Sequence, residues 1–436
     1  MDGPVQETER QPGAPLREED VAAHVRGICF KTGPPSRTGV ELEWLVRDRR
    51  APTAEVPAAR LDAALAPLQA PGGLPRGGVL TREPGGQLEL SCPPAASAAR
   101  CVADAAADLA ALRRALEPAG LVLDGSGLDP WRAPSRVLDH PRYDAMERYF
   151  DQAGPWGRTM MRATAAVQVS VDAGDDGDGV TGYRFRWLLA HRLGPVLVAA
   201  FANSPLQHHG RPSGWVSSRQ AVWARMDPGR TRQPPDAWPD PRGAWARYAL
   251  DARVMCVRRP PPADWTAPRD LPLRSWLSAW AGARPPTLDD VDYHLTTLFP
   301  PVRPRGWLEL RMIDAQPGDG WAVPVLVASA LLEDPAAAGT AFEATGRLAP
   351  GRDVPPWDVW LRAARAGPAD PQLGTAVRTC LRAAHDALDR LGTPAALRGA
   401  VARFLEQYAL RGRCPADDRL DALRRDAPPR PMEGAL

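Results

Sequence analysis

Lysine is nearly absent from this sequence, in which Lys31 is the only one and almost every cation is arginine. The chain also lacks an excess of either charge, since 54 basic and 52 acidic residues leave a formal net charge of +2. Proteins that bind nucleic acid or an anionic membrane surface normally carry a basic excess or a basic stripe. The charge balance therefore predicts neither kind of partner.

Targeting and disulfide signals are also missing. The six cysteines form no Cys-x-x-Cys pair and no zinc-binding spacing. The first twenty residues, MDGPVQETERQPGAPLREED, contain no apolar segment and do not resemble a signal peptide. The longest apolar runs, GPVLVAAFA and WAVPVLVASALL, are too short to span a bilayer. These absences predict a cytoplasmic protein with reduced thiols and no membrane partner.

Familiar nucleotide-binding motifs are missing as well. No Gly-x-x-x-x-Gly-Lys loop occurs, and GSGLDP at 125–130 lacks the third glycine of a dinucleotide fingerprint. A nucleotide could then bind only through a metal ion and arginines on a sheet.

The pattern along the chain predicts an α+β protein. The length of 436 residues would by itself suggest about two or three domains. Residues 1–22 are expected to form a flexible tail. A helix is predicted over 97–120, where Ser97 can cap the start and Gly120 follows the end. More apolar helices are expected over 184–202 and 321–333, and the chain reads as helical from about 355 onward.

Four segments show the alternation of polar and apolar residues that is typical of strands: TGVELEWLV (38–46), TREPGGQLELS (81–91), TAAVQVSVD (164–172) and GWLELRMID (306–314). In each segment the polar side chains share one face, because successive side chains on a strand alternate. The polar set comprises Glu41, Glu43, Glu83, Glu89, Gln168, Glu309 and Arg311. Glu83 lies just before a turn predicted at Pro84-Gly85-Gly86. One interpretation is the solvated face of an antiparallel sheet.

The other interpretation is a metal site, because five glutamates on one face would repel each other unless a cation compensates them. Positions two apart on a strand are roughly 7 Å apart, which suits carboxylates that serve neighbouring ions about 3.5–4 Å apart. Oxygen-rich ligation with little histidine favours Mg²⁺ or Mn²⁺ over zinc.

Six segments together resemble the glutamate–cysteine ligases, in particular the plant-like branch and its ergothioneine-pathway members. They are GVELEW, REPGGQLELS, TAAVQVSVD, ANSPL, SSRQAVWARMDPGRT and DYHLTTLFPPVRPRGWLELR, and they occur in this order over roughly residues 23–335. The resemblance implies a single catalytic domain over 23–412, with helices bracing it from about 340 and a C-terminal tail at 413–436. It also implies a curved antiparallel half-barrel sheet of the glutamine synthetase-like type.

The resemblance further implies the chemistry. ATP phosphorylates the γ-carboxylate of L-glutamate, and the amine of L-cysteine displaces phosphate to give γ-glutamylcysteine, which would feed ergothioneine or another low-molecular-weight thiol. Mg²⁺ (or Mn²⁺) would be held at Glu41, Glu43, Glu83, Glu89 and Glu309. Arg311 matches an arginine that contacts the transferring phosphate, and Arg219 matches one that holds glutamate.

Three further residues are weaker candidates. Gln168 and His294 are candidates for the nucleotide and metal side of the site, although His294 could equally be a packed, hydrogen-bonded histidine. Arg230 either reaches substrate or closes a loop. Two other functions stay open: a carboxylate–amine ligase that joins glutamate to a different amine, and a catalytically silent relative that binds metal or nucleotide. The oligomeric state cannot be predicted from the sequence.

Overall fold

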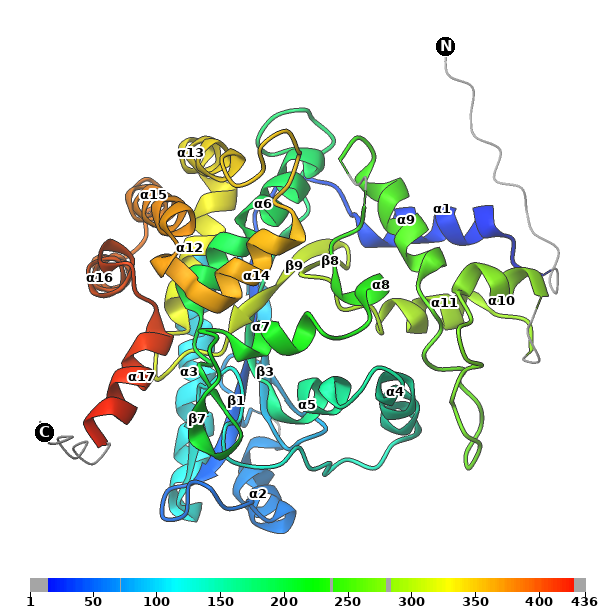
Figure 1. The fold of residues 1–436 in the computed structure, drawn as a ribbon, viewed down its shortest axis with the longest axis horizontal. Helices are drawn as coiled ribbons and strands as arrows, with labels where there is room; N and C mark the ends of the chain where they lie inside the picture. The colour runs from blue at the N-terminus through cyan, green and yellow to red at the C-terminus, as the bar shows by residue number, and fades with distance from the viewer. Residues whose placement is uncertain (1–14, 71, 236–237, 280–283, 427–436) are drawn as a thin grey trace, which may run out of the picture.

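The computed structural model describes residues 15–70, 72–235, 238–279 and 284–426. Within these ranges, seven strands form one sheet in which every pairing is antiparallel (Figure 1). The order is β2-β3-β1-β5-β9-β8, and β4 pairs with β1. The strands are β1 (Thr38–Asp48), β2 (Val79–Arg82), β3 (Leu88–Ala95), β4 (Leu121–Asp124), β5 (Ala166–Asp172), β8 (Val302–Pro304) and β9 (Trp307–Asp314). A separate hairpin joins β6 (Leu206–Gln207) and β7 (Arg211–Pro212).

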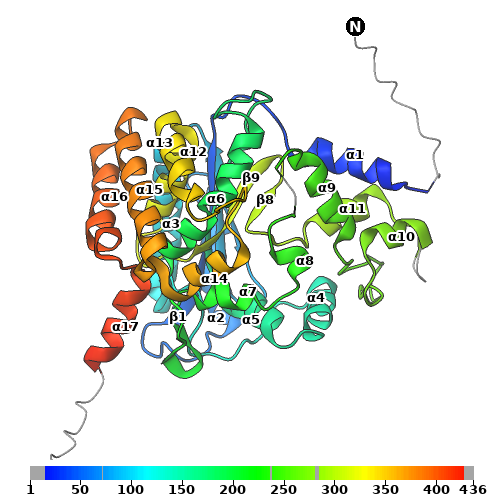
Figure 2. The same cartoon turned by 45° about the horizontal axis from the view of Figure 1, so that its top comes forward.

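Helices cover the apolar face of this sheet. The helices in direct contact with it are α3 (Ala98–Leu116), α6 (Tyr183–Phe201) and α12 (Ala322–Glu333). An outer set packs on them: α13 (Pro335–Gly346), α14 (Trp357–Ala366), α15 (Pro371–Arg390) and α16 (Ala395–Gln407). Figures 1 and 2 show this helical part on one side of the strands. Apolar side chains such as Leu42, Leu90, Val169 and Leu310 are almost fully buried there, so the main core lies between the sheet and these helices.

Shorter helices lie on the opposite side of the strands (Figures 1 and 2). They are α4 (Pro141–Asp151), α5 (Trp156–Ala163), α7 (Ser218–Trp223), α8 (Pro228–Thr231) and α11 (Leu288–Leu295), with α1 (Glu18–Cys29), α9 (Pro241–Asp251) and α10 (Leu273–Ala279) beyond them. The remaining helices are α2 (Ala58–Leu65) and α17 (Pro415–Asp426). A second, smaller apolar cluster with Met146, Met160, Met161 and Phe299 holds α4, α5 and the segment after α11 together.

The predicted strands and helices are present, with some changes of boundary. The segment 81–91 contains β2 and β3 joined by a turn, because Pro84 and Gly86, whose φ is 85°, reverse the chain. Ser97 caps α3 by accepting a hydrogen bond from the Arg100 amide at 3.2 Å. Gly120, with φ 66°, ends the helical segment in the left-handed conformation that favours glycine.

Both predicted tails are partly helical instead. Residues 1–14 and 427–436 lie outside the described residues, but α1 begins at Glu18 and buries Val21 completely. At the other end α17 occupies most of the described part of 413–436, with Ala416 buried in the helix and Cys414 buried just before it. In each case a few apolar side chains that dock on the body of the protein outweigh the polar composition that suggested a tail.

Within the described residues, no single helix has the length and apolar composition needed to cross a bilayer. In this part of the chain α12 and α13 pass the test only as a pair, and the chain bends by 97° between them.

Candidate active site

An open cleft lies over the polar face of the sheet. Strand residues form its floor, while α4, α5, α7 and the segments that follow α11 form its walls. The charged and amide side chains that line it are Glu41, Glu43, Glu83, Gln87, Glu89, Arg142, Gln168, Arg219, Arg303, Arg305 and Arg311. Most of the predicted site residues are thus brought together in a single concave site.

Strand register explains how the glutamates meet. In the antiparallel pairing of β1 and β3, Glu43 lies opposite Glu89, and in the pairing of β1 and β5, Glu41 lies opposite Gln168. Directly opposed residues on one face have neighbouring side chains. The Gln168 amide also donates to Glu43 Oε1 at 2.8 Å. Residues that are far apart in sequence therefore share one small area of the floor.

Glu83 reaches the cleft from the turn between β2 and β3. The turn is closed by hydrogen bonds from the Glu83 amide to the Gln87 carbonyl at 2.9 Å and from the Gly86 amide back to the Glu83 carbonyl at 2.8 Å. A Cβ on Gly85 would lie 1.9 Å from the carbonyl oxygen of Arg162 at the end of α5. Only glycine lets the turn approach α5 this closely, and this approach sets the position of Glu83.

The cleft carboxylates have raised pKa values, because they are buried and lie close to one another. Burial raises the pKa of Glu41, Glu43 and Glu83 to about 7, and neighbouring carboxylates add to each shift. Burial, followed by the charge of Glu43, also raises the pKa of Glu89. A buried group of like charges binds protons or a cation more readily than it stays ionised alone. The site is therefore suited to a positively charged ligand.

Glu309 departs from the prediction that all five glutamates converge on one face of the sheet, because the other four line the cleft and Glu309 does not. Its side chain is completely buried and forms ion pairs with Arg303 at 2.8 Å, with Arg305 at 3.6 Å and with Arg311. Burial alone would raise the pKa of Glu309, but these arginines outweigh it and hold the pKa at about 2. Glu309 lies behind the wall of the cleft and fixes arginines there.

Arg311 occupies an irregular position in β9. Val167 pairs with Ile313 and Val169 pairs with Leu310, so two residues of β9, Arg311 and Met312, face the single residue Gln168. This is a β-bulge, which redirects side chains and is frequent near active sites. The Arg311 guanidinium contacts both Gln168 and Glu309 through Nη1, while its buried Nε has no partner.

Arg219 comes from α7 and is almost completely buried at the cleft wall. Its Nη2 donates to the Arg311 carbonyl at 2.8 Å, but its buried Nε and Nη1 have no hydrogen-bond partner. Unpaired buried donors are costly unless an acceptor completes them. An anionic ligand in the cleft, such as a carboxylate, would satisfy these two nitrogens.

The other two candidates have structural contacts outside the cleft lining. His294 is buried, its Nε2 lies 2.9 Å from the Ala249 carbonyl, and burial lowers its pKa to about 3. Arg230 is completely buried and binds the carbonyls of Thr297 and Arg253. In this conformation His294 is a packed histidine and Arg230 closes a loop, as the alternative interpretations proposed.

Other cleft residues were missed by reasoning on the sequence. Arg303 and Arg305 lie on and beside β8, and Arg142 at the start of α4 donates to Thr296 Oγ1 at 3.0 Å. Arg303 and Arg305 stand six and four residues before Glu309 in the sequence. No local pattern indicated that their side chains would face the cleft. Trp223 also lines the cleft, and the Arg219 guanidinium lies 5.6 Å from the centre of its ring.

The carboxylates do not form a ready-made metal cage. Among the described residues, no group of three or more histidine, cysteine, aspartate or glutamate side chains is arranged to hold a metal ion. Three of the carboxylates accept hydrogen bonds from other side chains: Glu89 from Thr81 and Ser91, Glu43 from Gln168, and Glu309 from arginines. The donor set nevertheless consists of oxygen atoms, as hard divalent cations require.

Comparisons with known proteins agree with the resemblance found in the sequence. A family model described as glutamate-cysteine ligase family 2 matches residues 37–436. The glutamate–cysteine ligase EgtA of Mycolicibacterium smegmatis is 40% identical over 408 residues, which span 92% of this chain and 90% of that protein. The EgtA protein of Mycobacterium tuberculosis H37Rv is 41% identical over 403 residues, which span 91% and 88%. The chloroplastic glutamate–cysteine ligase of Medicago truncatula is 34% identical over 246 residues, 55% of this chain and 47% of that protein.

Solved structures are more distant. The match to a bifunctional glutathione synthetase from Pasteurella multocida spans 94% of this chain and 52% of the synthetase, with 13% sequence identity and a TM-score of 0.47.

Proposed function

The chain belongs to glutamate–cysteine ligase family 2, and from this membership and the cleft we propose that it joins L-glutamate to L-cysteine at the expense of ATP. The γ-carboxylate oxygen of glutamate attacks the terminal phosphorus of ATP and ADP leaves. The amine of cysteine then attacks the acyl carbon of the γ-glutamyl phosphate, phosphate leaves with the bonding electrons, and the amine loses a proton. The products are γ-glutamylcysteine, ADP and phosphate.

Glu41, Glu43, Glu83 and Glu89 are the residues that would hold Mg²⁺ or Mn²⁺. Their raised pKa values and oxygen donors fit a hard divalent cation, which would supply positive charge against the ATP phosphates. Gln168 donates to Glu43 and thereby fixes the direction of that carboxylate. Glu309 serves first to orient Arg303 and Arg311, because both arginines already occupy its oxygens.

The arginines receive the negative parts of the substrates. Arg219, with two buried nitrogens that lack a hydrogen-bond partner, is the proposed partner of a glutamate carboxylate. Arg311 points into the same cleft beside Gln168, and we assign it to the transferring phosphoryl group. Phosphoryl transfer asks the protein mainly for positioning and charge stabilisation, and this cleft provides both without a nucleophilic side chain.

The observation that carries the proposal is this charge pattern: four carboxylates of raised pKa share one cleft with arginines whose nitrogens lack partners. The test is to incubate the purified protein with ATP, Mg²⁺, glutamate and one amine at a time, and to measure phosphate release and nucleotide products. Release that requires both glutamate and cysteine and yields ADP supports the proposal. A preference for another amine would indicate a related ligase, and no release with any amine would indicate a silent relative. AMP as the main product would contradict acyl phosphate chemistry.

The proposal also includes finer expectations. These are a curved half-barrel form of the sheet of the glutamine synthetase-like type, one catalytic domain over most of the chain, a cytoplasmic location, and use of the product in ergothioneine formation or that of another small thiol.

A further inference from the structure

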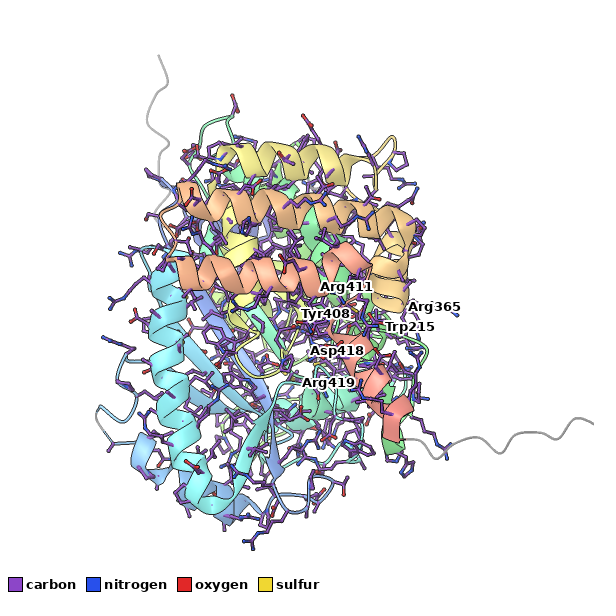
Figure 3. The ribbon with its side chains drawn as sticks, turned by 90° about the vertical axis from the view of Figure 1, so that its left-hand side faces the viewer. Trp215, Arg365, Tyr408, Arg411, Asp418 and Arg419 are labelled. Atoms are coloured by element: carbon purple, nitrogen blue, oxygen red, sulfur yellow. The ribbon has the colours of Figure 1, made fainter. Side chains whose placement is uncertain are left out.

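The C-terminal helix α17 is attached to the protein by polar contacts as well as apolar ones. The Ala416 amide donates to the Ala202 carbonyl at 3.0 Å, and Tyr408 at the end of α16 donates to Asp418 at 2.6 Å. Figure 3 shows Tyr408, Asp418 and Arg419 together where α17 meets the rest of the chain. The sequence predicted no role for this helix. Its contacts in the structure suggest one.

Arg419 connects α17 to the interior. Its Nε donates to Asn203 Oδ1 at 2.8 Å, and its Nη2 lies 3.5 Å from Asp124. Asn203 is completely buried, and its Nδ2 donates to the carbonyls of Gly125 and Ala315 at 2.6 and 2.8 Å. Arg419 therefore supplies the hydrogen-bond donor for the side-chain oxygen of Asn203.

Asn203 in turn belongs to a network centred on Asp314. The backbone amide of Asn203 and the Ser204 hydroxyl donate to Asp314 Oδ2 at 2.9 and 2.7 Å. The Ser217 hydroxyl donates to Asp314 Oδ1 at 2.9 Å. Asn203 and Ser204 belong to the ANSPL segment and Ser217 to the SSRQAVW segment. Two motifs thus meet on one buried carboxylate that is about a hundred positions further along the chain. The β-bulge at Arg311 and Met312 turns this carboxylate towards the cleft side of the sheet.

The network ends at the cleft. Arg219 Nη1 lies 3.8 Å from Asp314 Oδ1, and the Arg219 amide donates to Ser204 Oγ at 3.1 Å. Both the side chain and the backbone of Arg219 are therefore set by residues of this network. Asn203, Ser204, Ser217, Asp314 and Arg219 are all at most 3% exposed, so water offers no substitute for a missing partner.

We propose that Arg419 of the C-terminal helix is a positioning residue for Arg219, acting through Asn203 and Asp314. The inference rests on the proposed function, because Arg219 is taken to hold glutamate. If Arg419 is lost, Asn203 Oδ1 becomes a buried acceptor without its donor, and Asn203 and the carboxylate below Arg219 are held less firmly. The affinity for glutamate then falls, while the ATP side of the cleft keeps its contacts.

The test compares Arg419→Ala with Arg424→Ala in the full chain. Arg424 lies on the same helix but is exposed and pairs only with Asp421 among the described residues, at 2.9 Å. Equilibrium binding of L-glutamate is measured by titration calorimetry, and KM is measured for glutamate and for ATP. Arg419→Ala should weaken glutamate binding about 3- to 10-fold and leave the KM for ATP within about two-fold, the size expected for residues that act through others. Arg424→Ala should change neither.

Conservative variants separate positioning from general damage. Arg419→Lys should restore most of the glutamate affinity, since its ammonium can still donate to Asn203. If Arg419→Ala does not fold, Arg419→Met, which keeps an extended side chain but has no donor for Asn203 Oδ1, serves for the same comparison. Equal glutamate affinity in the Arg419 and Arg424 variants would overturn the inference, as would an equal loss for glutamate and ATP.

Different results would reject the proposed function and the role of Arg419. Absence of ligation with retained, Arg419-dependent glutamate binding would reject the proposed function and leave this inference standing. Normal ligation, with a glutamate affinity that does not change when Arg419 is replaced, would reject the role of Arg419 and leave the proposed function standing.

Discussion

Replacing Arg311 with alanine is the most direct perturbation of the proposed phosphoryl transfer. Arg311 is mostly buried, contacts Gln168 and Glu309 through Nη1, and keeps an unpartnered Nε. Its positive charge also lowers the pKa of Glu41 and Glu43, against the effect of burial. The variant removes a positive charge that acts on both carboxylates and that we assign to the transferring phosphoryl group.

The expected loss can be worked from this position. Two unit charges about 4 Å apart near a protein surface interact by about 4 kcal/mol. Removing one preorganised donor to a developing charge costs about 3–4 kcal/mol in other enzymes, which is roughly 100- to 1,000-fold in kcat. Because the contact is made to the transferring group, kcat should fall far more than the affinity for ATP. Lysine should rescue only in part, since it lacks the planar fork that grips phosphate oxygens.

The assay is steady-state phosphate release by the purified variants, with the thermal midpoint measured beside it. Glu309 keeps Arg303 at 2.8 Å after the substitution, so the fold should survive. An arginine that served only as an ion-pair partner would change the stability and leave turnover close to normal. Near-normal kcat in a folded Arg311→Ala protein would remove Arg311 from the active site.

Three further outcomes follow from the cleft and its surroundings. The three cleft glutamates with pKa near 7 bind protons in the folded state that an unfolded chain releases near 4.5, so their contribution to stability falls as pH rises from about 4.5 to 7. Mg²⁺ must displace those protons, and it should raise the thermal midpoint more at pH 8 than at pH 5.5; an equal rise at both values would contradict the site. Gly85→Ala places a Cβ 1.9 Å from a backbone oxygen and should cost about 1–3 kcal/mol and most of the activity, whereas Gly339→Ala, with no atom nearby, should cost neither. Burial raises the pKa of the Cys256 thiol to about 11, and the other cysteines are also shifted upward, so serine at each of the six positions should leave kcat within a few-fold unless packing fails.

Local pattern alone was enough to predict the floor of the cleft. Alternation along a strand places Glu41 and Glu43 on one face, and the same rule applied to Gln168 and Glu89. The Pro-Gly-Gly turn after Glu83 was equally readable, because those residues have few conformations in common with a strand. The helix over 97–120 followed from its cap and its terminal glycine. In each case the determining interactions lie within a few residues of the chain.

Features that depend on distant partners could not be read in the same way. Glu309 has the same local pattern as Glu43, but β8 brings Arg303 against it and pairs its carboxylate with an arginine. The α17 helix looked like a tail, because its few anchoring contacts, such as that of Arg419 with Asn203, join residues more than two hundred positions apart.

Asp314 shows the difference most clearly. Strict alternation from Leu308 and Leu310 places Asp314 on the apolar face, whereas the β-bulge at Arg311 adds one residue and turns Asp314 towards Arg219. The sequence by itself determined the strands, the turn and the carboxylates that can face a cation, because period and turn chemistry are local. Only the tertiary structure decided which charges are neutralised by partners and which remain open to a ligand, because that depends on register, bulges and the packing of remote helices.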